Sequence, residues 1–320
     1  MGSEIRNINI LVTGSSGLVG RAIQRVVRNK EYEHITIIPV SSGVCDLTNR
    51  EETCAMFERI KPTHVIHLAA RVGGLFKNMN EKVQMLEDNI MMNSVVLQMC
   101  HKFGVEKCVM CLSTCIFPDK TKYPIDETML HDGPPHASND AYAYAKRLAE
   151  VQCRAYREQY GSNFVCVIPT NVYGPCDNYS LTDGHVIPSL IHKCFNAKRD
   201  GVSFDISGTG RPLRQFIYSD DLARLILWVL EKYDETEPII LSPPEDSEVS
   251  IGDAAAHIAK AFDYEHMLNI TGEGPDGQFR KTACNNKLME RIGEFAFMPF
   301  DIGVGESIRW FVNNYDVVRK

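Results

Sequence analysis

Short apolar runs alternate along the first half of the chain with longer segments whose apolar residues recur at helical spacing. The apolar runs lie at 8–13, 35–40, 63–70, 107–112 and 164–169, and the helical segments between them lie at 18–27, 54–60, 82–103 and 141–160. Near-continuous apolar strands separated by helices are typical of a parallel sheet that is covered on both faces. We therefore predict an α/β fold with a doubly wound parallel sheet.

This alternation ends at Pro169, where the composition changes. Residues 170–214 are rich in Gly, Pro, Asn and Asp, which indicates loops around one helix at 186–195. A strand and a helix return at 215–230, and after a further short strand the chain mixes helices with loops. We predict a nucleotide-binding domain at 1–170 and 215–243 and a smaller, discontinuous, mixed α/β substrate-binding domain at 171–214 and 244–320.

Composition and charge narrow the class of partner. The 320 residues are 44% hydrophobic and 23% charged, and the net charge of −7 argues against broad binding to nucleic acid or to acidic membranes. A small-molecule partner is therefore expected. The N-terminus lacks the pattern of a signal peptide, and no segment approaches the roughly 18 apolar residues of a membrane span.

The cysteines favour a cytoplasmic protein with free thiols. Eleven is an odd number, and the chain shows no export signal, so a disulfide framework is not expected. Cys108 and Cys111 form a CxxC pair inside a predicted strand. Because side chains alternate along a strand, the two thiols would face opposite sides of the sheet, and no metal site is expected there.

A glycine-rich loop joins the first strand to the first helix. It consists of Gly14, Ser15, Ser16, Gly17, Leu18, Val19 and Gly20. Glycines at such a turn allow the backbone to approach a pyrophosphate, whose negative charge is stabilised at the N-terminus of the helix. The setting between a strand and a helix indicates a dinucleotide-binding, Rossmann-type domain.

The end of the second strand favours NADP over NAD. Folds that bind NAD place an acid there to hold the ribose hydroxyls, whereas this chain has Ser41 and Ser42. No carboxylate would repel a 2′-phosphate, and the two hydroxyls could donate hydrogen bonds to it. Asp46 and Leu47 are candidates for the adenine edge, with an ordinary loop cap as the alternative.

Tyr142 and Lys146 lie four residues apart on a predicted helix and therefore on one face of it, whereas Tyr144 points elsewhere. A tyrosine hydroxyl titrates near pH 10 unaided, and we expect a neighbouring ammonium and an oxidised nicotinamide to lower that pKa. The hydroxyl could then donate a proton to a ketone that receives a hydride. The alternative is a chance pair on an amphipathic surface helix.

Ser113 and Cys115 lie two residues apart, where an apolar strand gives way to a loop. Buried free cysteines usually behave as small hydrophobic residues. A thiol at the end of a strand, close to a candidate cofactor, could instead act as an acid. From the residues alone, both interpretations of Cys115 remain open.

Seven stretches, taken in order, resemble a known family. They are HLAARVGG, LSTCIFP, YAYAKR, IPTNVYGP, DGHVIPSLIHK, GTGRPLRQFIYSDDLA and DGQFRKT. Together they resemble the GDP-L-fucose synthases, a family of extended short-chain dehydrogenase/reductases, over nearly the whole chain up to Lys281. The resemblance implies 3,5-epimerisation of GDP-4-keto-6-deoxy-D-mannose, its reduction with NADPH, and a homodimer formed through the helices at 82–103 and 141–160. The alternatives are an enzyme acting on another nucleotide sugar and a noncatalytic NADP-binding protein.

The resemblance also implies roles for individual residues. It places Ser113 and Tyr142 at the C4 carbonyl, Lys146 on the nicotinamide ribose, and Cys115 with His185 as the acid/base pair of epimerisation. Cofactor contacts are implied at the glycine loop and at Leu68, Ala69, Ala70, Cys111, Leu112, Ser113, Thr114, Pro169, Thr170, Asn171, Val172 and His185. Substrate contacts are implied at Lys193, Ser207, Arg214 and Asp276, although the family often has Trp at the position of Ser207.

Overall fold

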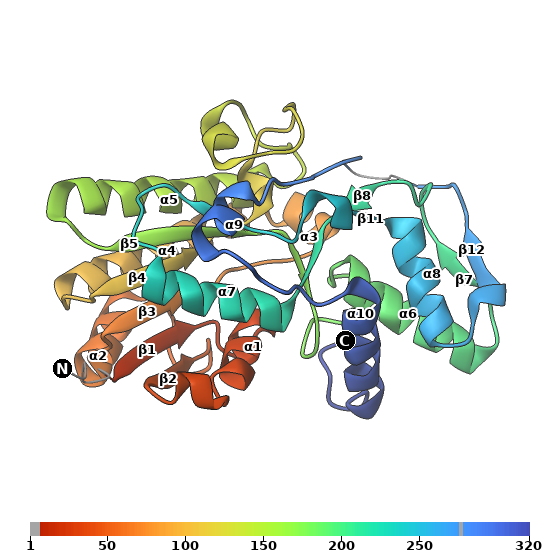
Figure 1. Ribbon diagram of the computed structural model, residues 1–320, viewed down its shortest axis with the longest axis horizontal. Helices are drawn as coiled ribbons and strands as arrows, with labels where there is room; N and C mark the ends of the chain where they lie inside the picture. The colour runs from red at the N-terminus through yellow and green to blue at the C-terminus, as the bar shows by residue number, and fades with distance from the viewer. Residues whose placement is uncertain (1–6, 275–277) are drawn as a thin grey trace.

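The computed structural model describes residues 7–274 and 278–320, and a parallel sheet forms its centre (Figure 1). Within these residues the sheet has six strands in the order β2-β1-β3-β4-β5-β10. The strands are β1 (Ile8–Thr13), β2 (Ile35–Val40), β3 (His64–His67), β4 (Lys107–Cys111), β5 (Phe164–Pro169) and β10 (Ile239–Leu241). Since β1 pairs with β2 on one side and with β3 on the other, the order in which strands are added to the sheet reverses at β1. Such a switch point places a ligand crevice beyond the carboxyl ends of β1 and β3.

Helices cover both faces of this sheet, as the sequence predicts (Figure 1). One face is covered by α2 (Arg50–Ile60), α4 (Lys82–Lys102) and α5 (Asp140–Tyr160). The other is covered by α1 (Leu18–Val26), α7 (Ser219–Lys232) and α9 (Asn286–Ile292), and α3 (Leu75–Asn80) precedes α4. The starts and ends predicted for the helices at 82–103 and 141–160 are confirmed to within one residue.

The side chains of β4 divide between the two cores that flank the sheet. Cys108 and Met110 belong to the core beneath α2, α4 and α5, whereas Val109 and Cys111 pack against the core beneath α1 and α7. This alternation confirms that the CxxC thiols face opposite sides. Each cysteine in the described structure is a free thiol, and no group of three or more possible metal ligands lies together within the described residues.

A smaller body built from later segments has its own core (Figure 1). Its helices are α6 (Val186–Asp200), α8 (Ile251–Ala261) and α10 (Phe300–Asn313). Its short strand pairs are β6 (Asn171–Tyr173) with β9 (Phe216–Tyr218), β7 (Phe204–Ile206) with β12 (Leu268–Ile270), and β8 (Leu213–Arg214) with β11 (Val249–Ser250). The sequence analysis did not predict most of these strands, because two or three residues are too few to show an alternating pattern.

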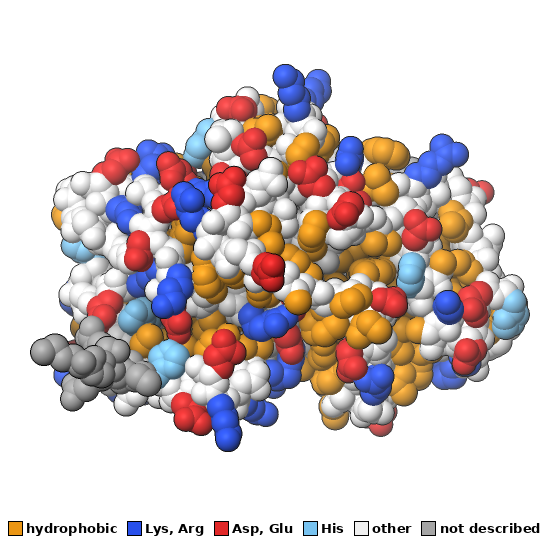
Figure 2. Space-filling model, in the orientation of Figure 1, with side chains coloured by type: hydrophobic (Ala, Val, Ile, Leu, Met, Phe, Trp, Pro, Cys, Tyr) orange, Lys and Arg blue, Asp and Glu red, His pale blue; other side chains and the backbone are white. Residues whose placement is uncertain are grey.

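The surface agrees with the mixed charge of the chain. Figure 2 shows acidic and basic side chains interspersed over one face, with hydrophobic side chains gathered between the sheet and the smaller body. Among the described helices, none is long and apolar enough to cross a membrane.

Candidate active site

Two glycines allow close backbone packing in and around the loop after β1. Gly14 has a φ of +67°, and a Cβ there would lie 2.8 Å from the backbone nitrogen of Ala69, in the loop after β3. A Cβ at Gly20 would lie 2.6 Å from Cα of Ser15. Only glycine allows both approaches, so the turn leaves the N-terminus of α1 open above the sheet edge. Such a cradle fits the pyrophosphate of a dinucleotide.

The other residues implied for the cofactor follow the carboxyl ends of neighbouring strands. They are Ser41 and Ser42 after β2, Leu68 to Ala70 after β3, Leu112 to Thr114 after β4, and Thr170 to Val172 after β5, with Cys111 and Pro169 as the last residues of β4 and β5. The Thr170 hydroxyl is buried and has no hydrogen-bond partner within the described residues, so it is a polar group that a bound molecule could satisfy. The residues that the sequence analysis predicted for the cofactor therefore lie at the same edge of the sheet.

Asp46 and Leu47 are both engaged within the protein. The Asp46 carboxylate accepts hydrogen bonds from the backbone nitrogen and the hydroxyl of Thr48, at 2.9 and 2.7 Å. Leu47 belongs to the core beneath α2, α4 and α5. The Asp46 carboxylate therefore caps this loop, and a contact of either residue with the adenine edge stays a prediction.

Lys146 is held at the end of β4. Its buried Nζ donates a hydrogen bond of 2.8 Å to the carbonyl of Cys111 and lies 5.9 Å from the ring centre of Tyr142. Tyr144 points away from both and is 46% exposed. Tyr142 and Lys146 therefore face the sheet edge together, which a chance pair on a solvent-exposed helix face would not do.

The pKa of Tyr142 differs from the sequence-based expectation. Burial raises this pKa well above its usual value, and the nearby Cys115 and Cys111 thiols raise it further. The expected lowering is not found in the chain alone, because burial is the largest effect on this phenol and disfavours its charged form. A phenol that stays protonated is suited to donate a proton.

Ser113 and Cys115 are held in a tight turn at the end of β4. The Ser113 hydroxyl accepts a hydrogen bond of 3.4 Å from the backbone nitrogen of Cys115. Arg147 on α5 donates from Nε to the carbonyl of Ile116 at 2.5 Å, which ties the turn to the helix. Burial raises the pKa of Cys115, while hydrogen bonding with Ser113 and the charges of Lys281 and Lys146 oppose that rise.

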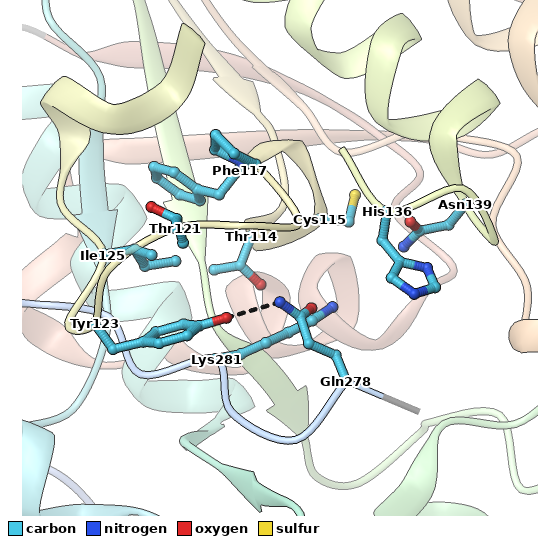
Figure 3. A pocket seen from close by; sticks show the side chains of 11 residues that line it. Thr114, Cys115, Phe117, Thr121, Tyr123, Ile125, His136, Asn139, Gln278 and Lys281 are labelled. Carbon is cyan, nitrogen blue, oxygen red and sulfur yellow. Dashed lines mark hydrogen bonds between the residues drawn. The ribbon is translucent and has the colours of Figure 1, made fainter. Parts of the chain in front are cut away.

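A pocket opens beside Cys115, lined by side chains from three distant segments (Figure 3). The lining residues are Thr114, Cys115, Phe117, Pro118, Thr121, Tyr123, Ile125, His136, Asn139, Gln278 and Lys281. Cys115 therefore lines a pocket that also holds polar and charged groups. This environment favours the interpretation of Cys115 as a reactive group.

The far wall of the pocket consists of a segment near the C-terminus that pairs with the loop after β4. The Ile125 nitrogen donates to the Thr282 carbonyl, and the Cys284 nitrogen donates to the Ile125 carbonyl, both at 2.8 Å. This pairing brings Gln278 and Lys281 into the pocket, where Gln278 donates to the Tyr123 hydroxyl at 2.8 Å (Figure 3).

The sequence analysis assigned no role to Gln278, Lys281, His136 or Tyr123. Gln278 and Lys281 lie in the DGQFRKT stretch that supports the family resemblance, and this stretch was the available signal for both. His136 and Tyr123 lie in the loops between β4 and α5. Neither residue lies in one of the seven stretches that support the resemblance.

Lys281 lines this pocket, and a second cation, Arg214, lies within electrostatic range of it. Burial lowers the pKa of Lys281 and that of Arg214, and each group is within electrostatic range of the other. The hydroxyl of Tyr123 also interacts with Arg214. Partly dehydrated cations attract a phosphate-bearing ligand more strongly than cations in bulk water do.

The remaining residues implied for the substrate lie elsewhere. Lys193 is exposed on α6, and its charge lowers the pKa of Asp205. Ser207 is exposed after β7, next to Gly274. Asp276 lies outside the described residues.

His185 lies on another segment, at the N-terminus of α6. His185 is exposed, yet surrounding protein and the charge of Arg319 lower the pKa of its imidazole. The loop before it, at 182–184, packs against Gly74. His185 is not among the residues that line the pocket at Cys115. His185 therefore lies outside this pocket, and its joint role with Cys115 stays a prediction.

Asp177 precedes this loop and is only 4% exposed. Its Oδ1 accepts a hydrogen bond from the Asn178 nitrogen, whereas its Oδ2 has no partner within the described residues, and burial raises the pKa to about 7. A raised carboxyl pKa contributes stability below the unfolded value of 3.8 that is lost as the pH rises toward 7.

Because of this linkage, Asp177→Asn is expected to increase the free energy of unfolding by about 2 to 4 kcal/mol near pH 8 and by much less near pH 4. Urea unfolding at the two pH values measures the difference. Asp183→Asn, an exposed position in the same loop, is the control and is expected to change little. An equal gain at both pH values would contradict a buried, ionising Asp177.

Comparisons with known proteins agree with this geometry. The model of the NAD dependent epimerase/dehydratase family matches residues 10–242. A GDP-L-fucose synthase of Dictyostelium discoideum is 53% identical over 97% of each chain, and a probable GDP-L-fucose synthase of Drosophila melanogaster is 48% identical over 97% of this chain and 99% of its own.

A solved structure is similar over the same extent. The GDP-L-fucose synthetase of Naegleria fowleri bound to NADP has a TM-score of 0.92 and 45% identity, over 98% of this chain and 96% of that one. With the parallel sheet, the glycine loop and the pocket at Cys115, these matches show that the chain belongs to the NAD dependent epimerase/dehydratase family and, within it, to the GDP-L-fucose synthases.

Proposed function

We propose that this chain converts GDP-4-keto-6-deoxy-D-mannose to GDP-L-fucose by epimerising C3 and C5 and reducing C4 with NADPH. The observation that carries the proposal is the position of Tyr142 and Lys146 beside Cys115, at the sheet edge that also holds the glycine loop. The names of the relatives and the NADP-bound neighbour support the substrate and the cofactor.

In the reduction, this chain supplies the proton and the positioning. Bound NADPH supplies a hydride to C4. Tyr142, protonated because of its raised pKa, donates its proton to O4, and the Ser113 hydroxyl donates a hydrogen bond to the same oxygen. Lys146, fixed at the Cys111 carbonyl, would hold the nicotinamide ribose.

The C4 ketone also makes epimerisation possible. Both C3 and C5 adjoin the carbonyl, so removal of either proton leaves the electron pair delocalised onto O4, where Ser113 and Tyr142 stabilise it. Inversion requires that a proton leaves one face of the ring and returns to the other. His185 is neutral because its pKa is lowered and can accept the proton, whereas Cys115 is protonated because its pKa is raised and can donate one.

The nucleotide part of the substrate requires cationic side chains near its diphosphate and a site wide enough to hold it. Arg214 and Lys281 suit the diphosphate of GDP. Lys193, Ser207 and Asp276 are proposed as further substrate contacts on the smaller body, where the small side chain of Ser207 would leave a wider site. In this proposal 1–170 and 215–243 bind NADPH, and 171–214 and 244–320 bind the sugar nucleotide.

A single incubation tests the whole proposal. The purified chain is mixed with GDP-4-keto-6-deoxy-D-mannose and NADPH in heavy water, and the product is identified by NMR. We expect GDP-L-fucose with deuterium at C3 and C5. Reduction of another nucleotide sugar in preference would indicate a related enzyme, and NADPH binding without any turnover would indicate a noncatalytic protein.

We also propose a cytoplasmic homodimer formed through α4 and α5. These neighbouring helices expose Val83 and Met91 on α4 and Tyr144, Leu148 and Tyr160 on α5. Pairing with a second copy would remove this apolar surface from water. Light scattering is expected to report a dimer for the native chain and a monomer for Leu148→Glu. A monomeric native chain would contradict the proposal.

A further inference from the structure

The 2′-phosphate of NADPH distinguishes it from NADH and requires a cationic partner. The end of β2 supplies hydroxyls at Ser41 and Ser42 and no basic side chain. The cation must therefore come from another element that reaches the same place.

Arg21 on α1 lies beside the glycine loop, next to the end of β1. Side chains of a helix lean toward its N-terminus, so a residue one turn into α1 covers the loop before the helix. The Nε of Arg21 donates a hydrogen bond of 3.3 Å to the carbonyl of Ser16, in the glycine loop. This contact places the guanidinium beside the loop, within electrostatic range of Cys176.

The glycine loop is in turn tied to the end of β2. The nitrogen of Ser15 donates a hydrogen bond of 3.2 Å to the carbonyl of Val40, the residue before Ser41. The glycine loop therefore connects Arg21 with the end of β2, near which the adenosine ribose of a dinucleotide lies in this fold.

The arginines of α1 differ in their partners. Arg25 pairs with Asp220 at 2.5 Å and also contacts Ser219. Within the described residues, Arg21 has no carboxylate partner, and its hydrogen bond uses Nε, which leaves both terminal nitrogens for a ligand. Arg21 is also exposed at the loop.

We propose that Arg21 binds the 2′-phosphate of NADPH and sets the preference for NADPH over NADH. The inference rests on the NADPH-dependent function proposed above. A guanidinium can donate two parallel hydrogen bonds to phosphate oxygens, and the hydroxyl of Ser41 can donate a third.

Direct binding tests the role without any sugar substrate. The fluorescence change on binding gives Kd for NADPH and for NADH separately. Arg21→Gln is expected to weaken NADPH binding roughly tenfold to a hundredfold, the range for charged hydrogen bonds, with little change for NADH. Arg21→Lys keeps the charge and is expected to recover part of the loss.

Arg28→Gln is the matched control, because Arg28 is an exposed arginine just after the end of α1, at the opposite end of the helix from the glycine loop. It is expected to leave both Kd values unchanged, and thermal unfolding checks that each variant is folded. Equal weakening of NADPH and NADH would assign Arg21 to the shared pyrophosphate, and no change in either would exclude it from the site. Either result would overturn the inference, whereas a native chain that binds neither cofactor would refute the proposed function itself.

Discussion

Tyr142→Phe is expected to slow hydride transfer to C4 by roughly two to four orders of magnitude, the range for loss of a general acid. The substitution keeps the ring that packs at the end of β4 and removes only the donated proton. Single-turnover oxidation of NADPH, followed by its absorbance, measures the step. Because burial raises the pKa of Tyr142, the native rate should stay constant through neutral pH and fall only when the pH approaches that raised value.

Tyr144→Phe is the control for this experiment. Tyr144 lies on the same helix, yet it is exposed and points away from the sheet edge. The control should retain the native rate. A loss smaller than tenfold in Tyr142→Phe, measured in the single-turnover regime, would remove Tyr142 from the chemistry.

Cys115→Ala is expected to stop inversion while hydride transfer continues slowly. Without the thiol, a proton removed by His185 can return only to the same face, so the ketone is reduced before it is inverted. The product is expected to contain partly or wholly unepimerised 6-deoxyhexose, and any deuterium at C3 or C5 with retained configuration would mark proton exchange at His185 without inversion. NMR of the product measures configuration and deuterium together.

The two altered pKa values set the pH range of inversion. Neutral His185 and protonated Cys115 are the active forms, so incorporation of deuterium should be constant through neutral pH. It should fall in acid as His185 is protonated below 6.5, and in alkali as Cys115 ionises above 9.0. Cys115→Ser, whose hydroxyl is a much weaker acid, should resemble Cys115→Ala.

Cys100→Ala separates this role from packing. Cys100 is fully buried in the core beneath α4, so its replacement should cost on the order of 1 kcal/mol of stability and leave the product unchanged. If Cys115→Ala behaved in the same way and made GDP-L-fucose with full deuterium at near-native rate, Cys115 would be a packing residue and another group would donate the proton.

Burial favours opposite roles in proton transfer for the two proposed proton carriers, Cys115 as donor and His185 as acceptor. Burial disfavours the charged form of any group, and therefore raises the pKa of a thiol and lowers that of an imidazole. At neutral pH this leaves Cys115 with a proton to give and His185 with a free electron pair. The ammonium groups of Lys281 and Lys146 favour the thiolate that forms when Cys115 donates.

Local sequence patterns determined the main elements of the fold. Apolar runs of six to eight residues and longer helical stretches predict β1 to β5 and α4 to α5 correctly, because the alternation of strand and helix requires buried faces that are visible in the order of residues. The glycine loop and the Tyr142/Lys146 pair are also local features. The geometry of the glycine loop follows from one backbone turn, and that of the Tyr142/Lys146 pair from one turn of a helix. Residues a few positions apart in the sequence are therefore enough to predict both.

Tertiary structure alone decided which distant residues come into contact and how burial alters the pKa values of their side chains. Lys281 and Gln278 reach the pocket of Cys115 because the chain at 282–284 pairs with Ile125, a contact between segments more than 150 residues apart that no local pattern contains. The same holds for the raised pKa values of Tyr142 and Asp177, which depend on burial by many neighbours and not on residue type. Residue identity supplied the reacting groups, whereas long-range packing set their partners, their solvation and therefore their protonation.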